Sequence, residues 1–345
     1  MRFYPKFIIQ SNILKGQEHN VKTVSFSIAA FLLLTTTSAF AADGTLVLYT
    51  SQPNTDAQQT ADAFMAENPG VKVEWVRDGT PKIMAKLRAE IEAGSPQPDL
   101  LLIADVVTME GLKKEGRLLA HPNADLSAFA GAQSDPDKTY FSTKLITTGI
   151  VYNTKAPFVP TSWADLEKPE AKGLVALPSP LTSGAALIHT VTLTENLSEG
   201  WGFYEKLGAN GAQAAGGNGD VLKAVSGGDK LFGMIVDYMP IREKAKGAPV
   251  EFVFPTEGVS AVTEPVAILS TAKNPEAAKA FVDFILSEKG QALASSQGYI
   301  PAREGVALPA GYPERSAIKV LPFDAAKALA DETANKEKFS EAMGQ

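Results

Sequence analysis

Short β-type runs alternate with amphipathic helical segments in the first third of the chain, and this alternation constrains the fold more than any other feature. The runs are TLVLYT (45–50), VKVEWV (71–76) and DLLLIA (99–104), and each precedes a segment with helical periodicity. In the first such segment Ala57 and Phe64 belong to one apolar face. Strands separated by helices pair in parallel, so the pattern predicts an α/β domain with a largely parallel sheet.

The middle of the chain predicts a second α/β unit that is reached and left through two extended segments. LITTGIVYNT (145–154) is a long β-branched run, and AVTEPVAIL (261–269) is a matching return. Beyond the return comes a helix with Pro275 in its first turn, and the stretch from Asp324 is predicted to be a helix lying on the first lobe. Two lobes joined by two crossings enclose a cleft. The predicted boundaries are 42–148 with 264–345 for lobe 1 and 149–263 for lobe 2.

The first 41 residues are predicted to be a removable signal peptide. SFSIAAFLLLTT (25–36) is a short apolar run that follows Lys22 and precedes Ala39 and Ala41 at A-x-A spacing, so we expect cleavage after Ala41. About 12 apolar residues are too few to span a bilayer, which needs about 20. A conventional signal would begin at Val21, which suggests that translation starts there. The chain is therefore expected to be exported.

Composition narrows the class of the exported protein. The 345 residues are 45% hydrophobic and 21% charged, which suffices for one or two sizeable cores. With no cysteine, disulfides, a thiolate nucleophile and a cysteine metal site are all excluded. The predicted leader holds four basic residues and one acidic residue, so the mature net charge is −10. An acidic chain without a basic run is not expected to bind nucleic acid.

A set of segments in a fixed order resembles the periplasmic solute-binding proteins of bacterial ABC importers. The resemblance lies in the branch that contains the binding proteins for ferric ion, phosphonates and sugar phosphates, and it covers nearly all of the mature chain. The segments that carry it are LVLYTSQPNTDAQQTADAFMAENPGVKVEWVRDGTPKIMAKLRAE, DLLLIADVVTMEGLKKEGRLLAH, GIVYNT, PTSWADL, PSPLTSGAA and EPVAILSTAKNPEAAKAFVDFILSEKGQ.

The resemblance implies a two-lobed, type II periplasmic-binding-protein fold that closes on a small solute and presents it to a permease in the inner membrane. It implies a monomeric transport protein of the periplasm that has no cofactor and catalyses no reaction. The absence of a lipid-attachment cysteine agrees with a freely diffusing form. Closure by hinge bending requires strand positions that absorb a backbone change, and the two crossings provide them.

The first candidate ligand residues lie in lobe 1. Ser51 and Gln52 end the first strand, where open α/β sheets bind ligands at the carboxyl edge. Gly79 and Thr80 precede a helix that starts at a proline, so Thr80 is either an ordinary helix cap or part of an anion site. Arg77 would add positive charge there unless it is simply solvated.

A matching helix start is predicted in lobe 2. Thr182, Ser183 and Gly184 open the helix that follows PSPL. Two helix N-termini that face each other across a cleft would form a cradle for a phosphate or phosphonate, because both present backbone N–H groups and a positive dipole end. This pair is the preferred anion site, with plain capping as the alternative.

Two carboxylates extend the prediction to zwitterions. Asp237 ends the strand GMIVD, and Asp105 ends the strand LLIAD, where it is also a natural helix cap. A carboxylate at a strand end can receive an ammonium group while helix ends hold the acid group. We therefore predict 2-aminoethylphosphonate or a phosphate ester as the solute.

Ferric iron is the alternative solute. The resemblance implies two adjacent tyrosines after this strand as iron ligands, but the chain reads Asp237-Tyr238 there, so the pair is broken. Tyr140 would be a further phenolate if iron were bound. His121 and His189 share no metal-ligand spacing, so a zinc site is not expected.

Catalysis is not expected, because the chain has none of the required motifs. PLTSGAA does not match the nucleophile elbow, and AAGGNGDV (214–221) lacks the lysine and the spacing of a phosphate-binding loop. An exported scaffold without a small-molecule ligand is a third class, which the cleft-like strand ends disfavour.

Overall fold

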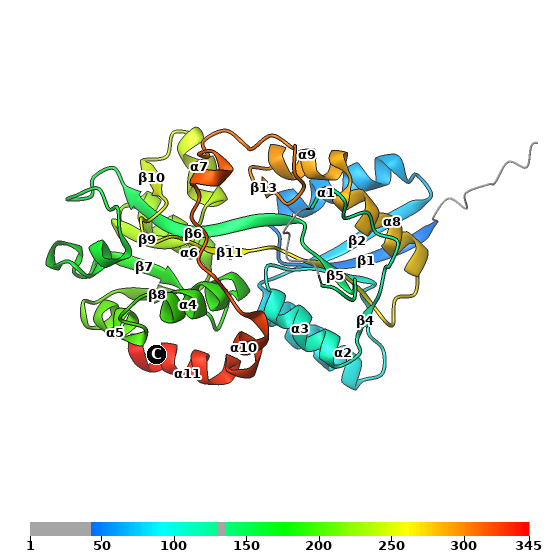
Figure 1. The fold of residues 1–345 in the computed structure, drawn as a ribbon, viewed down its shortest axis with the longest axis horizontal. Helices are drawn as coiled ribbons and strands as arrows, with labels where there is room; N and C mark the ends of the chain where they lie inside the picture. The colour runs from blue at the N-terminus through cyan, green and yellow to red at the C-terminus, as the bar shows by residue number, and fades with distance from the viewer. Residues whose placement is uncertain (1–42, 130–134, 345) are drawn as a thin grey trace, which may run out of the picture. The chain divides into compact units, whose positions relative to one another are not determined.

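The structure is a computed structural model that describes residues 43–129 and 135–344 (Figure 1). The described residues form two mixed β-sheets covered by helices. The signal peptide, its cleavage site and the translation start lie outside the described residues, so these remain predictions.

The first sheet has the strand order β2-β1-β3-β12-β4, with β5 beside β12. Strand β1 pairs in parallel with β2 and β3, as the alternating pattern predicts, whereas β12 runs antiparallel to β3, β4 and β5. The strands are β1 Gly44–Thr50, β2 Val71–Arg77, β3 Leu100–Leu102, β4 Leu118–Leu119, β5 Tyr140–Phe141 and β12 Val266–Leu269. The helices that accompany them are α1 Asn54–Glu67, α2 Thr80–Glu92, α3 Val106–Lys114, α8 Pro275–Leu286 and α9 Glu288–Ser296.

The second sheet has the order β10-β6-β9-β7-β8, and β11 and β13 also pair with β6. Strand β7 is parallel to β8 and β9, and β6 is antiparallel to its partners. The strands are β6 Lys144–Asn153, β7 Val175–Pro178, β8 Gln213–Ala215, β9 Phe232–Val236, β10 Val250–Val253, β11 Ser260–Val262 and β13 Ile300–Pro301. The helices are α4 Gly184–Asn196, α5 Trp201–Ala209, α6 Asn218–Gly227 and α7 Tyr238–Ala245, with 3₁₀ turns at Trp163–Glu167, Pro169–Ala171 and Arg315–Ala317.

Both predicted crossing segments are extended. The first is β6, the long strand that crosses the middle of Figure 1. The second begins as β11, which pairs antiparallel with β6 through residues 146–148, and continues as β12 in the first sheet. Between β11 and β12 stands Glu264, whose φ of 37° is unusual for a residue other than glycine. These two connections therefore lie side by side, and after β12 the chain returns to the second sheet once more, at β13 and α11. The predicted lobe boundaries stay a prediction.

The C-terminal stretch was predicted to be one helix on the first lobe, and the structure differs from this prediction. It forms two helices, α10 Ala325–Ala330 and α11 Glu332–Met343. Helix α10 contacts α3, but α11 contacts α5, beside the second sheet (Figure 1). The cause is Phe339, which is fully buried and meets the ring of Tyr204 edge-on at 5.6 Å.

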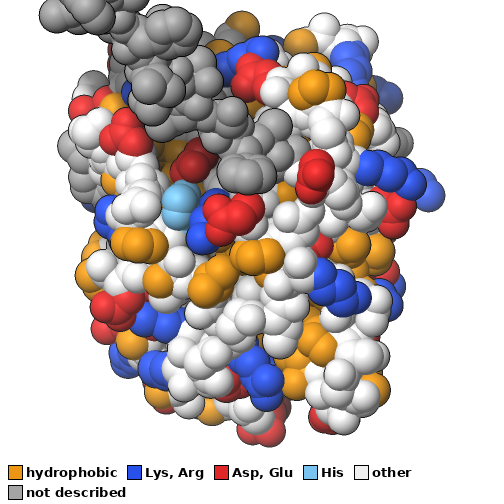
Figure 2. All heavy atoms as spheres, turned by 90° about the vertical axis from the view of Figure 1, so that its right-hand side faces the viewer, with side chains coloured by type: hydrophobic (Ala, Val, Ile, Leu, Met, Phe, Trp, Pro, Cys, Tyr) orange, Lys and Arg blue, Asp and Glu red, His pale blue; other side chains and the backbone are white. Residues whose placement is uncertain are grey.

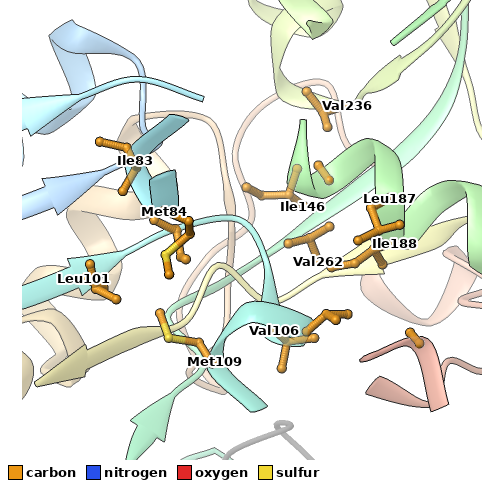
Figure 3. Packing of buried hydrophobic residues seen from close by; sticks show 14 of the residues in the cluster. Ile83, Met84, Leu101, Val106, Met109, Ile146, Leu187, Ile188, Val236 and Val262 are labelled. Atoms are coloured by element: carbon orange, nitrogen blue, oxygen red, sulfur yellow. The ribbon is translucent and has the colours of Figure 1, made fainter. Parts of the chain in front are cut away.

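One apolar cluster joins elements of both sheets. Met84 of α2 and Val106 of α3 lie in the same cluster as Ile146 of β6, Leu187 of α4 and Val262 of β11 (Figure 3). All five side chains are buried, and burial of an aliphatic side chain contributes about 1.5–3 kcal/mol. Further clusters lie within each sheet's own helices. Apolar contact therefore holds the two sheets together in this structure.

The surface carries charges of both signs. On the face in Figure 2, blue and red side chains are interspersed among polar and apolar ones. Within residues 43–129 and 135–344, no helix combines the length and the apolar character needed to cross a membrane.

Candidate functional site

A cavity of about 560 Å³ lies where helices of the two sheets begin. Its volume is in the range of small-molecule sites, which is about 300–1,000 Å³. Both sheets contribute to it: Ser51, Pro53 and residues 77–82 come from the first sheet and its helices, and residues 181–185, 216–220, Val236, Tyr238 and Met239 from the second. Ala104, Ile146 and Glu264 complete the lining.

Three helices point their N-termini into this cavity. Helices α2, α4 and α6 begin at lining residues. Helix α7 also begins at one, Tyr238, but the N–H of Tyr238 already donates to Asp237. The first N–H groups of a helix have no partner inside the helix and carry its positive dipole end. Five of these donors have no hydrogen-bond acceptor among the described residues, namely the backbone N–H groups of Thr80, Gly184, Ala185, Asn218 and Gly219. The cavity therefore offers an anion several backbone donors at once.

Side-chain hydrogen bonds fix the helix starts of the second sheet. Ser183 caps α4, since its Oγ accepts from the N–H of Ala186 at 3.3 Å, and it also accepts from Asn218 Nδ2 at 3.4 Å. The other amide atom of Asn218, Oδ1, accepts from the N–H of Val236 at 3.1 Å. Thr182 donates its hydroxyl to the carbonyl of Gly216. The donors of α4 and α6 are thus held in place without a ligand, which reduces the cost of binding.

Both signs of charge line the cavity. Arg77 is exposed, and its Nε donates to the carbonyl of Gln52 at 2.8 Å. Lys82 lies 3.6 Å from Asp78 in an exposed ion pair. Asp220 receives the N–H of Gly217 at 2.8 Å and so caps α6. Cations at the start of α2 add to the helix dipoles, while the carboxylates supply acceptors for hydroxyl or ammonium groups.

Glu264 is the strained residue of the cavity lining. It is almost fully buried and pairs with Lys144 Nζ at 2.5 Å from Oε2. Burial raises the pKa of the Glu264 carboxyl, and the charge of Lys144 opposes that rise. Strained backbone is concentrated at functional sites, where the surrounding structure enforces it. The strain lies on the return connection between the sheets, at the cavity wall.

Tyr238 is the aromatic residue of the lining. It begins α7 directly after β9, and its ring lies 4.5 Å from the ring of Tyr299 and 4.5 Å from the guanidinium of Arg242. Burial raises the pKa of the Tyr238 phenol, and the charge of Glu264 raises it further. The group is therefore a neutral hydrogen-bonding hydroxyl at neutral pH.

Most of the predicted ligand residues are brought together in this cavity. Both halves of the predicted cradle are present, and α6 adds a third helix end. The predicted residues that line the cavity are Ser51, Arg77, Gly79, Thr80, Thr182, Ser183, Gly184 and Tyr238.

The two predicted ammonium-binding carboxylates lie outside the lining. Asp237 is fully buried and accepts from the N–H and hydroxyl of Thr147 at 3.0 and 2.7 Å and from the N–H of Tyr238 at 2.7 Å. Burial raises the pKa of Asp237 to about 6. Asp105 caps α3 by accepting from Val107 and Thr108, and burial raises its pKa as well. Both carboxylates have internal partners, so the expected ammonium site is not formed by them in this structure.

Gln52 and Tyr140 are also outside the lining. Gln52 is buried and hydrogen-bonds to Glu264 behind the cavity wall. Tyr140 lies in β5, and its hydroxyl donates to Glu110. The phenolate pair expected for iron is therefore not assembled in this structure, because β5 is on the far side of β12 from the cavity-lining strands.

The residues that sequence reasoning missed are mainly the start of α6. The segment 216–220 lines the cavity, although its glycines do not match a phosphate-binding loop. A usable signal was present: the glycines follow a short strand, and Asp220 stands at the third helical position, where its carboxylate accepts from the N–H of Gly217. Asp78, Lys82 and Met239 were also missed, since nothing in their local pattern separates them from solvated loop residues.

Within residues 43–129 and 135–344, both histidines have a hydrogen-bonding partner. His121 lies 2.7 Å from Asp283, and His189 lies 2.8 Å from Ser260. Burial lowers the pKa of His189 to about 3. In the part of the chain that the structure describes, no group of three or more His, Cys, Asp and Glu side chains is arranged to hold a metal ion.

Comparison with known proteins agrees with this geometry. Residues 59–320 match the family model for bacterial extracellular solute-binding proteins, and the chain belongs to that family. An uncharacterized protein of Haemophilus influenzae is 29% identical over 290 residues, which cover 80% of this chain and 83% of that protein.

Solved structures confirm the predicted fold class. The periplasmic binding protein AfuA of Actinobacillus pleuropneumoniae, solved with fructose-6-phosphate bound, superposes with a TM-score of 0.80 at 23% identity, covering 88% of this chain and 99% of that one. Iron-bound HitA of Pseudomonas aeruginosa gives a TM-score of 0.73 at 23% identity, covering 86% and 99%. The fold is thus that of a two-lobed periplasmic binding protein, and the resemblance found in the sequence is correct.

Proposed function

We propose that this protein captures a small phosphate ester in its cavity and delivers it, without chemical change, to the membrane permease of an ABC importer. One observation carries the proposal: the N-termini of α2, α4 and α6 meet at one cavity with five backbone N–H groups that have no acceptor among the described residues. A phosphoryl group has three acceptor oxygens and negative charge, which suits such donors.

The remainder of the cavity favours an ester over inorganic phosphate. About 560 Å³ is far more than a phosphate ion fills. The carboxylates of Asp78 and Asp220, which line the cavity, can accept hydrogen bonds from the hydroxyl groups of a sugar or polyol. An aminoalkylphosphonate is a second member of the same class; Asp237 and Asp105 have internal partners, so its ammonium group would have to bind Asp78 or Asp220.

Family membership and the leader support a periplasmic location. The family is one of extracellular solute-binding proteins, and the predicted signal peptide would direct export. We infer a monomer that diffuses between the outer and inner membranes and meets the permease when loaded.

Ferric iron is the alternative solute, and the observation that favours it is Tyr238. This phenol lines the cavity at the end of β9. Against iron, the second candidate phenol, Tyr140, is bonded to Glu110, and burial raises the pKa of both tyrosines. Hard Fe³⁺ would have to recruit Tyr238 with carboxylates that now serve as caps and ion-pair partners.

A thermal-shift panel tests the proposal. The mature chain from Ala42, unfolded and refolded to remove carried-over ligand, is measured with fructose 6-phosphate, 2-aminoethylphosphonate, inorganic phosphate, putrescine and ferric citrate. A solute at 100 times its Kd stabilises the protein by about 2.7 kcal/mol, which raises the midpoint by several degrees.

The pattern of shifts decides between the solutes. We expect the largest rise with fructose 6-phosphate and a smaller one with inorganic phosphate. A rise with ferric citrate alone, together with a visible phenolate absorption band, would establish iron instead. No rise with any phosphate or phosphonate compound contradicts the proposal.

A further inference from the structure

Two glycines stand where the helix starts of the two sheets meet beside the cavity. Gly79 precedes α2 and has φ −59° and ψ 147°, a conformation open to any residue. A Cβ at this position would lie 2.7 Å from the carbonyl oxygen of Thr182, which belongs to the segment before α4. Real Cβ atoms do not approach a backbone oxygen so closely, so a side chain here would push the two segments apart.

Gly184 makes the reciprocal contact. It is the first residue of α4 and does not have a positive φ. A Cβ here would lie 2.7 Å from the Cβ of Asp105 and 3.0 Å from the carbonyl oxygen of Ala104, both in the segment before α3. The backbone conformation at Gly79 and Gly184 is open to other residues, so it does not explain why both positions are glycine. The close approach of the opposite segment is the physical reason, because it leaves no room for a side chain.

We propose that Gly79 and Gly184 are positioning residues that allow the two halves of the cavity to meet around a solute. The hypothetical Cβ atoms point at the facing segment and not at the donors, so the glycines act on closure and leave the hydrogen-bonding groups unchanged. Met84, Val106 and Leu187 belong to a buried cluster formed by the same helices (Figure 3). This inference rests on the proposed function, because it takes the cavity to be the solute site.

The energetic consequence is a shift in population. A protein that binds only when closed has an apparent Kd equal to its intrinsic Kd divided by the closed fraction. A methyl group forced against a packed backbone lowers the closed fraction, so solute affinity falls at least about tenfold. The open form has no such clash, and replacing glycine by alanine slightly restricts the unfolded chain, so stability without solute is kept.

The test compares Gly79→Ala and Gly184→Ala with the wild type and with Gly227→Ala. Gly227 is the exposed last residue of α6, where a Cβ meets nothing within 4 Å, and it does not line the cavity. Each mature protein is titrated by calorimetry with fructose 6-phosphate, 2-aminoethylphosphonate and inorganic phosphate. Thermal midpoints without solute and the radius of gyration with and without solute, from small-angle scattering, are measured on the same samples.

The expected result is a Kd at least about tenfold higher in both cavity variants, a wild-type Kd in Gly227→Ala, and thermal midpoints without solute that stay near the wild type. The decrease in radius of gyration on binding should be smaller in the cavity variants. A wild type that binds, with both variants binding equally well, overturns the inference alone. Variants that lose several degrees without solute but keep their affinity overturn it too, since the contact would then be permanent packing. A wild type that binds none of the three compounds overturns the proposed function and this inference together.

Discussion

The cavity and the buried charge cluster beside it differ in whether their charged and polar groups have partners. The cluster consists of Asp56, Lys144, Arg242, Glu264 and Tyr299. In it, Arg242 Nη1 lies 3.0 Å from Asp56, Tyr299 donates its hydroxyl to Asp56 at 2.5 Å, and Lys144 pairs with Glu264 at 2.5 Å. Every full charge in the cluster therefore has an opposite charge, whereas the cavity gathers backbone donors that have no acceptor among the described residues.

The difference shows which region is built for a solute. A buried charge without a partner costs several kcal/mol, so the opposite charges of the cluster stabilise one another and have little to offer a ligand. Backbone N–H groups at helix ends carry only partial charge and can remain open to solvent at low cost until an anion arrives. The cluster should therefore govern stability, and the cavity should govern affinity.

The largest effect is expected when the cluster loses one carboxylate. Asp56→Asn leaves the guanidinium of Arg242 buried without its counter-charge, and breaking such a pair costs about 3–5 kcal/mol. The free energy of unfolding, measured in urea, should fall by about this amount. Glu74→Gln is the control, because its ion pair with Lys72 is exposed and contributes less than about 1 kcal/mol. Equal losses in the two variants would show that the cluster is not the stabilising element.

The next effect concerns His189, a buried group of α4 without an opposite charge. Burial lowers its pKa to about 3, so between pH 6.5 and 3 the unfolded chain binds the proton and the folded protein does not. The free energy of unfolding is therefore not reduced by His189 above pH 6.5, and it falls as the pH decreases below that value. From pH 7 to 5 the wild type should lose about 2 kcal/mol relative to His189→Asn.

The comparison with His189→Asn is needed because the titration of Asp237 changes the stability of the folded protein in the opposite direction. Burial raises its pKa to about 6, so it stabilises the folded protein as the pH falls through 6 toward its unfolded value. Urea titrations of both proteins at pH 7 and 5 separate the two groups. Identical pH dependence in wild type and His189→Asn would contradict the assignment to His189.

A smaller effect is expected at the cavity itself. Arg77→Gln removes a guanidinium that lies beside the start of α2 and is otherwise exposed. The affinity for a phosphate ester should fall about tenfold, which corresponds to about 1.4 kcal/mol, while the free energy of unfolding changes by less than about 0.5 kcal/mol. Calorimetry and urea unfolding check the two numbers. A large loss of stability with unchanged affinity would contradict the conclusion that the cavity governs affinity and the cluster governs stability.

The smallest effect is expected at Lys82. Its side chain is 77% exposed and its nearest carboxylate, in Asp78, is 3.6 Å away. Lys82→Gln should weaken binding of the same ester by about threefold or less at 0.15 M salt and by more at 0.01 M, because the Debye length grows from about 8 to about 30 Å. A salt-independent loss would indicate direct contact with the solute.

The repeat of strand and helix was readable from local pattern alone. Leu46 and Leu48 of the first strand and the helical face of Ala57 and Phe64 are buried as expected, because side-chain periodicity follows from backbone geometry. The helix start at Ser183 was also predictable, since a capping side chain acts over a few neighbouring positions. Thr80 was predicted to cap a helix that starts at Pro81, but it is itself the first residue of α2, and Gly79 precedes it without a side-chain cap. The helix start at Asn218 was missed because its glycines resembled an imperfect motif.

Side chains at strand ends were less predictable. Asp237 and Asp105 have the local pattern of ligand residues, but Thr147 and the start of α3 bind them first. Likewise Phe339 brings α11 to α5, although the segment's sequence gives no preference for that partner. In each case the deciding neighbour is distant in sequence.

The sequence by itself determined the class of fold, the family and the two helix starts of the anion cradle, because periodicity, capping and segment order are local or linear properties. Only the tertiary structure decided which residues face the cavity, that α6 joins α2 and α4 there, and that Gly79 and Gly184 touch the opposite segment. The physical reason is that burial and hydrogen-bond partners arise from contacts between elements far apart in the chain. For Asp237 such contacts decide whether its oxygens are occupied, and for Gly79 they decide whether a methyl group has room.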